Sequence, residues 1–325
     1  MELRPEFDWD RGIHLRGSVL WFDAPRQDVF TFLSSARVRE SGRHKKALCN
    51  DRTRHLVRVQ SPGFSPLVVP FGAALRLGPM EISLHPSGHM PGAAIMRVVS
   101  DGTIALYASH VSLVPHALAE APQVPTGDVL VARADYGHLA SRFPTRTEAL
   151  GRVVEAACCT LAMGRTPVFL GSVMGKSQEV IRALSDARVL VEAHRSICEV
   201  NRGYRELGFN PGIAPQYRGS PRSGHALVLP ETMRFGTAVT GLKNAKLYWL
   251  SGRSLVPEVL ARMQVDEGIP LTGHLDAPGL ERLVELTGVK RVVTVGHGAE
   301  EFAERIRLRG FEAQALHREV QLSMF

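Results

Sequence analysis

The sequence contains few cysteines, and none is placed for a disulfide framework or a zinc site. The four are Cys49, Cys158, Cys159 and Cys198, and no pair has the CxxC spacing of zinc-binding or redox motifs. Two of them are adjacent in an apolar segment whose periodicity predicts a helix. We therefore expect buried thiols in a reducing compartment.

Long apolar runs are also absent. Residues 1–12, MELRPEFDWDRG, are charged and aromatic and do not contain the apolar core of a secretory signal peptide. No apolar run reaches the roughly 18 residues that a membrane span requires. Hydrophobic residues nonetheless make up 44% of the chain, which is enough for a sizeable core. These features predict a globular, cytoplasmic protein that does not enter a membrane.

Positive charge is in excess. Lys and Arg outnumber Asp and Glu by 39 to 32, which gives a formal net charge of +7. A basic surface attracts polyanions because binding releases their condensed counterions. Residues 215–225, PQYRGSPRSGH, predict an exposed loop whose charge suits a phosphate backbone. A solvated linker is the plainer interpretation of the same residues.

The periodicity of apolar residues changes along the chain. Between residues 17 and 110, short apolar runs alternate with turn residues, which predicts strands. From residue 146 the apolar residues recur three and four apart, which predicts a helix. Residues 167–208 then predict strand, glycine turn, helix, strand and helix, the βα repeat of a parallel sheet. The pattern indicates an α/β protein, and 325 residues suit about two domains.

Three histidines follow apolar strands in glycine-containing turns. They are His89 in LHPSGHMPGAA, His274 in LTGHLDAPG and His297 in VTVGHGAEE. Such turns lie at the carboxyl edge of a sheet, where the active sites of α/β proteins gather. A single loop histidine is usually a surface or structural residue. Three in the same local setting predict a shared site.

The segments that carry these histidines resemble, in the same order, motifs of metallo-β-lactamase-fold nucleases of the β-CASP type. SGHMPGAAIMRV resembles the GHxxGSA motif, LTGHLDAPGLERLV the SxHAD segment, and VKRVVTVGHGAEEFAERIRLRGF the VFxxHGxxE segment. PVFLGSVMGKSQEVIRAL is similar to a segment of bacterial ligase-associated exonucleases, a branch that also resembles mRNA 3′-end processing factors. The resemblance covers nearly the whole chain.

The resemblance implies a particular architecture. The core would be a four-layer αββα metallo-β-lactamase fold built from both chain ends, residues 1–145 and 256–325. A β-CASP α/β insert would occupy residues 146–255. The groove between core and insert would be the path of a nucleic acid.

The main metal-binding motif of that family is not retained. The family uses two Zn²⁺ or Mn²⁺ ions, held largely by HxHxDH, to clamp a scissile phosphate. The corresponding residues 32–44 are FLSSARVRESGRH. They place Ser35 and Arg37 at the two HxH positions, and Arg39 and Glu40 at the Asp-His pair. Guanidinium groups stay protonated and repel a divalent cation.

Two further acidic positions have also changed. The bridging aspartate of the family corresponds to His110, and the first β-CASP acid corresponds to Arg133. By the resemblance, His89 and His297 are the surviving metal ligands, and His274 matches the catalytic histidine that assists the leaving group. Catalytic zinc takes three protein ligands and a water, so one ligand per ion is too few. We expect no metal, with His89, His110 and His297 as vestigial or rearranged ligands.

Lys176 lies in GSVMGKS, residues 171–177. Its glycines are four apart, where a P-loop has them five apart, so nucleotide hydrolysis is not indicated. A helix that begins after a glycine can still bind phosphate through its free N–H groups. We therefore expect Lys176 to contact a backbone phosphate.

Together these features favour a pseudonuclease. The expected ligand is the backbone of DNA or RNA, held by Arg37, Arg39, Arg133 and Lys176, because guanidinium–phosphate pairing is largely indifferent to sequence. The expected protein partner is an active nuclease homologue or another repair or RNA-processing protein. One alternative is an exonuclease or phosphodiesterase with a rearranged single Zn or Mn site among the four histidines named above. Another is a purely structural assembly module.

Overall fold

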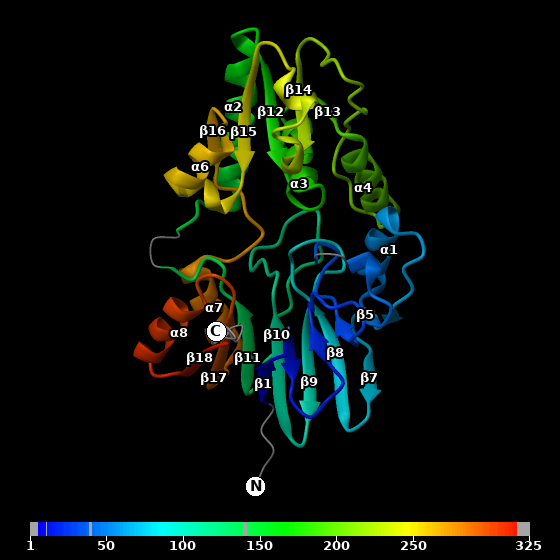
Figure 1. Ribbon diagram of the computed structural model, residues 1–325, viewed down its shortest axis with the longest axis vertical. Helices are drawn as coiled ribbons and strands as arrows, with labels where there is room; N and C mark the ends of the chain where they lie inside the picture. The colour runs from blue at the N-terminus through cyan, green and yellow to red at the C-terminus, as the bar shows by residue number, and fades with distance from the viewer. Residues whose placement is uncertain (1–5, 11, 39–40, 139–141, 317–325) are drawn as a thin grey trace, which may run out of the picture. The chain divides into compact units, whose positions relative to one another are not determined.

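The computed structural model describes residues 6–10, 12–38, 41–138 and 142–316 (Figure 1). The chain divides into two compact units: unit 1 is Met1–Arg142 with His274–Phe325, and unit 2 is Phe143–Gly273. The sequence had placed these boundaries at 145/146 and 255/256. Both units combine strands with helices, so the predicted α/β class is confirmed. Within the described residues, no helix has the length and apolarity needed to cross a membrane.

Unit 1 contains two sheets. The first has the order β1-β2-β3-β4-β5-β6, and the second has the order β18-β17-β11-β10-β9-β8-β7. The first sheet comprises β1 (Phe7–Trp9), β2 (Ile13–Leu15), β3 (Trp21–Phe22), β4 (Thr31–Phe32), β5 (Ala47–Cys49) and β6 (Leu67–Val68). The second comprises β7 (Ala74–Leu77), β8 (Met80–Pro86), β9 (Ala94–Ser100), β10 (Thr103–Ala108), β11 (Val129–Arg133), β17 (Arg291–Val295) and β18 (Glu312–Ala315). The helical segments are η1 (Ser41–Arg43), α1 (Asp51–Gln60), α7 (Ala277–Thr287) and α8 (Ala299–Leu308).

The central strands of the second sheet, β10, β11 and β17, are buried on both faces. Side chains alternate between the faces of a strand, so neighbouring residues of β11 enter different cores. Val129 and Val131 pack with the first sheet, beside Phe22 and Phe32. Leu130 packs on the opposite face, with buried residues of α7 and α8. Continuous apolar runs in β10 and β11 follow from this double burial.

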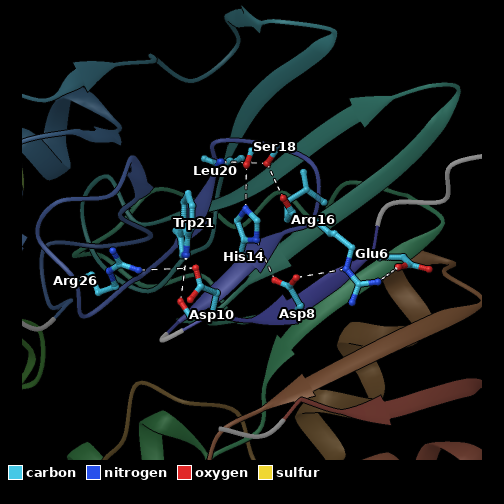
Figure 2. A network of polar contacts seen from close by, with 10 residues as sticks. Glu6, Asp8, Asp10, His14, Arg16, Ser18, Leu20, Trp21 and Arg26 are labelled. Atoms are coloured by element: carbon cyan, nitrogen blue, oxygen red, sulfur yellow. Dashed lines mark hydrogen bonds and ion pairs between the residues drawn. The ribbon is translucent and has the colours of Figure 1, made fainter. Parts of the chain in front are cut away.

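Polar contacts cover the outer edge of the first sheet, where β1 is the terminal strand (Figure 2). The His14 ring stacks on Trp21 with centroids 4.1 Å apart. Its Nδ1 lies 3.0 Å from an Asp8 carboxylate oxygen, and its Nε2 lies 2.9 Å from the Ser18 carbonyl oxygen. Arg16 donates to Asp8 as well. Charged side chains of this kind discourage an edge strand from pairing with another chain.

Unit 2 is built on a five-stranded sheet of order β13-β14-β12-β15-β16, in which every neighbouring pair is parallel. This confirms the βα repeat predicted from residues 167–208. Its strands are β12 (Thr166–Gly171), β13 (Leu190–Ala193), β14 (His225–Pro230), β15 (Ala245–Leu250) and β16 (Glu267–Ile269). Its helical segments are α2 (Arg146–Ala162), α3 (Lys176–Asp186), α4 (Arg195–Glu206), η2 (Glu231–Met233), α5 (Thr237–Thr240), η3 (Gly252–Leu255) and α6 (Pro257–Met263).

The adjacent thiols on α2 are exposed, so the prediction that they are buried was wrong. The buried face of α2 is formed by Ala149, Val153, Ala157 and Thr160. These residues follow the helical period and leave Cys158 and Cys159 off the buried face. The apolar character of the segment was therefore a poor guide to which side chains enter the core.

The turn between β8 and β9 carries His89 and is fixed by close backbone contact. Gly92 has a φ of 76°, and a Cβ at this position would collide with the backbone of Thr53 on α1. Thr53 Oγ1 donates a hydrogen bond of 2.8 Å to the Gly92 carbonyl. The Gly92 N–H donates to the Glu120 carboxylate. The position of His89 therefore depends on a glycine that no larger residue can replace without movement.

We predict that Gly92→Ala destabilises the protein much more than Gly102→Ala. Gly102 has nearly the same φ, 75°, but nothing lies within 4 Å of the position that a Cβ would take there. The backbone strain is thus matched, and only the collision differs. We expect a loss of roughly 2–4 kcal/mol of unfolding free energy for Gly92→Ala and about 1 kcal/mol for Gly102→Ala. Urea denaturation measures both, and equal losses would contradict the importance of this contact.

Candidate functional site

Three histidine rings lie next to one another in unit 1. The ring centroids of His89 and His110 are 5.2 Å apart, and those of His110 and His274 are 4.9 Å apart. We call His89, His110 and His274 the histidine row. His89 comes from the β8–β9 turn, His110 follows β10, and His274 precedes α7. The sequence predicted a shared site of turn histidines, and the structure brings His89 and His274 to either side of His110. His110 is the residue that corresponds to the bridging aspartate of the resembled family.

His110 is the central member of the row and is buried. Its Nδ1 lies 3.2 Å from Ser109 Oγ and 3.4 Å from Ser34 Oγ. Ser34 Oγ already donates its proton to Asp23, so it offers a lone pair to the ring. This arrangement favours a proton on Nδ1 and leaves the Nε2 lone pair free to accept.

The charge state of His110 follows from its surroundings. Burial is the main cause that lowers its pKa well below the usual value, and the nearby histidines His274 and His89 lower it further. The positive charges of Arg37 and Arg133 act in the same direction. His110 is therefore a neutral imidazole at neutral pH, and two guanidinium groups lie close enough to influence it.

Asp23 is a site residue that the sequence did not reveal. Its carboxylate accepts hydrogen bonds from Ser34 N–H at 2.7 Å, Ser34 Oγ at 2.6 Å and Tyr107 OH at 2.9 Å. Burial raises the pKa of Asp23, although these three donors and Arg133 favour its charged form. The only sequence signal was an acidic residue directly after the apolar run that forms β3. Asp23 joins the segments around β3 and β4 to β10.

Arg133 and Asp135 form an ion pair at the end of β11. Arg133 Nε donates to Asp135 Oδ2 at 2.7 Å. Burial alone would raise the pKa of Asp135, but the charge and hydrogen bond of Arg133, together with His274 and the His297 N–H, hold it below its usual value. The same carboxylate lies 3.9 Å from His274 Nδ1 and accepts from the His297 backbone N–H. Asp135 thus connects two of the predicted histidines.

The remaining predicted residues are placed as follows. Arg37 is half-buried in the turn after β4. Arg39 lies outside the described residues, as does Glu40. His297 is exposed and contacts the His138 ring, with centroids 5.5 Å apart, and is not a member of the histidine row.

Lys176 belongs to unit 2 and does not occupy the exposed position that a phosphate contact requires. It is buried at the start of α3, and its Nζ donates to the Leu250 carbonyl at 2.6 Å. The preceding Gly175 has a φ of 89°, and its N–H donates to Gln178. Burial of the ammonium against β15 gives Lys176 a structural role.

The donor set does not match the two-metal centre of the resembled family. Across the described part of the chain, no group of three or more His, Cys, Asp or Glu side chains is arranged to hold a metal ion. Within the described part of the main metal-binding motif, Ser35 is buried and Arg37 brings a positive charge, so neither residue replaces a family ligand. Asp135, whose carboxylate lies 3.9 Å from His274, is engaged by Arg133.

Two curated proteins are similar to this chain in sequence. No protein-family model matches the chain. It is 28% identical over 327 residues to a protein of Opitutus terrae named a probable DNA ligase, which covers 97% of this chain and 32% of that protein. It is 22% identical over 155 residues to RNase aCSPSF2 of Saccharolobus solfataricus, which covers 45% of this chain and 31% of that protein. The chain thus spans about a third of the length of these curated relatives.

Proposed function

We propose that this chain is a non-hydrolytic member of the β-CASP nucleases that binds the phosphate backbone of DNA or RNA. In this proposal unit 1 is an αββα metallo-β-lactamase-like core and unit 2 is the β-CASP insert. The observation that carries the proposal is the position of Arg133, whose partner Asp135 lies 3.9 Å from His274 of the histidine row. The charges of Arg133 and Arg37 also act on the buried His110 ring of that row. In this proposal, positive charge takes the place of the cations that the family would hold.

Guanidinium chemistry suits this role. Arginine presents a planar fork of donors that matches phosphate oxygens and remains charged at any physiological pH. Arg133 uses Nε for Asp135, and its terminal nitrogens make no hydrogen bond to any residue that the structure describes. The neutral His110 ring of the histidine row adds hydrogen-bonding groups without adding charge. The proposal extends to Arg39 on the basis of sequence alone.

The relatives support a role in nucleic-acid processing, since one is named a DNA ligase and the other an RNase. The first matches nearly all of this chain with 32% of its own length. A region similar to this chain is therefore joined, in that protein, to further sequence. We infer an accessory role beside an enzyme of repair or RNA processing, such as an active nuclease homologue.

Phosphodiester hydrolysis at a rearranged site, with Zn or Mn, is the second candidate. It is favoured by the pair of His274 Nδ1 and Asp135 Oδ2, 3.9 Å apart. A carboxylate beside an imidazole orients the ring, and a protonated His274 could donate to a leaving oxygen. The lack of a suitable ligand set among the described residues argues against metal assistance.

We predict that Arg37→Ala weakens binding of a labelled single-stranded oligonucleotide roughly fivefold at about 0.1 M salt. Losing one phosphate contact removes about 0.7 from the slope of log affinity against log salt concentration. Arg133→Ala should act in the same direction. Arg76→Ala is the matched control, because Arg76 is exposed on β7 and its side chain makes no hydrogen bond or ion pair with a described residue. Unchanged affinity and slope in both site variants would refute binding at this place.

We also predict that protein purified without chelator and dialysed against trace Zn²⁺ and Mn²⁺ retains far less than one ion per chain. The donor groups are too few and arginines oppose a cation. Elemental analysis measures the ratio. A value near one or two ions, together with divalent-ion-dependent cleavage that is lost in His89→Ala, would instead establish the hydrolytic alternative.

A further inference from the structure

Helix α4 of unit 2 carries arginines along one side. Its buried side is formed by Ile197, Val200, Asn201, Gly203 and Tyr204. The opposite side presents Arg195, Cys198, Arg202 and Arg205, at spacings of three, four and three residues. The helical period places these residues in one stripe about 15 Å long.

This stripe borders a hollow. A cavity of about 650 Å³ is lined by six residues, which we call the arginine groove: Arg195, Cys198, Glu199, Arg202, Arg205 and Gln216. A second cavity of about 350 Å³ shares Arg205 and adds residues of the 210–215 segment. The two cavities therefore adjoin, and the segment 210–216 forms the side facing α4.

The far wall is held in place by backbone bonds. Ala193 N–H donates to the Pro215 carbonyl at 2.9 Å, and Tyr217 N–H donates to the Ala193 carbonyl at 2.8 Å. Arg205 Nη1 donates to the Gly212 carbonyl at 3.2 Å. The sequence predicted either an exposed loop or a linker for residues 215–225. The first three of these residues, 215–217, are held beside β13 by these bonds.

Positive charge in and beside the groove exceeds the negative charge available to neutralise it. Arg195 pairs with Glu199 at 2.8 Å. Arg202 and Arg218 are exposed, and neither makes a side-chain hydrogen bond or ion pair with any residue in the described ranges. Arg218 follows Gln216 by two residues, at the end of the pinned wall. Two guanidinium groups therefore remain available to an anion.

The second cavity adds apolar surface to this charge. Ile213 lines it and is 80% exposed, an unusual state for so large an aliphatic side chain. Sugars and unstacked bases offer apolar faces next to phosphates, and only an unpaired strand presents its bases in this way. A hollow with arginines along one side and an exposed Ile213 beyond them matches that combination.

We propose that the arginine groove, with Arg218, binds the sugar–phosphate backbone of single-stranded nucleic acid. The inference rests on the proposed function for the kind of ligand, but it concerns a separate unit and separate residues. Arg202 and Arg218 contact phosphates, Arg205 contributes charge between the two cavities, and Ile213 packs against a sugar or base. Glu199 opposes the anion and is neutralised by Arg195.

The test compares two double variants by fluorescence anisotropy with a labelled oligothymidylate about 20 nucleotides long, which exceeds a typical single binding site. Arg202→Ala with Arg218→Ala removes the two available groups. Arg253→Ala with Arg262→Ala is the matched control, since it removes two exposed arginines from η3 and α6. Those elements lie by β16, and the sheet order puts β16 and β13 at opposite edges.

We expect the groove variant to raise Kd roughly tenfold at about 0.1 M salt and to reduce the salt slope by about 1.4, or 0.7 per lost phosphate contact. The control should stay within about twofold of wild type, because it loses only diffuse charge. Arg202→Lys with Arg218→Lys should recover most of the affinity, and all variants should share the wild-type urea midpoint.

Each other outcome has a distinct meaning. If wild type and the groove variant bind with equal Kd and equal salt slope, the proposal that the groove binds nucleic acid is overturned. The unit 1 proposal then remains intact. A large loss in the groove variant with none in Arg37→Ala or Arg133→Ala supports the groove and overturns the unit 1 site. A wild-type protein that does not bind the oligonucleotide overturns both.

Discussion

The parallel register of β10, β11 and β17 determines where the candidate residues of unit 1 lie. Ala108 is paired with Ala132, and Arg133 with Val295, so the three strands end at the same level. The chain segments that leave them carry His110, Asp135 and His297. Each strand is held in this register by cores on both faces of the sheet. The position of the site is therefore a consequence of strand pairing, and the chemistry depends on which side chains follow each strand.

At this edge, an ion pair lies at the end of β11. A carboxylate at the end of β11 would favour a cation, whereas Arg133 makes an ion pair with Asp135 two residues later. Gly296 permits this arrangement, because a Cβ there would collide with the Asp135 carboxylate. The pair is part-buried, so removal of either partner would leave a poorly solvated charge. The edge is therefore organised around an internal ion pair.

Local pattern predicted the fold class and the histidine turns, because strand alternation, helical period and glycine turns depend on neighbouring residues. It did not predict contacts that join distant parts of the chain. The partner of the Lys176 ammonium is the carbonyl of Leu250, 74 residues away, and no local pattern shows that this carbonyl needs a donor. Asp23 meets Tyr107 across 84 residues. The arginine stripe of α4 follows from helical period, but its facing wall requires the pairing of Pro215 and Tyr217 with Ala193.

The two proposed phosphate-binding places differ in the distance over which their charges should act. Arg133 is part-buried and its Nε is neutralised by Asp135, so its remaining donors act at short range through hydrogen bonds. Arg202 and Arg218 are exposed and form no ion pair with a described residue, so their attraction extends into solvent and is screened over about 10 Å at 0.1 M salt. The groove of unit 2 should therefore dominate capture at low ionic strength. The salt slope per phosphate contact should nonetheless be the same in both units, about 0.7, because each neutralised phosphate releases its counterions whichever arginine contacts it.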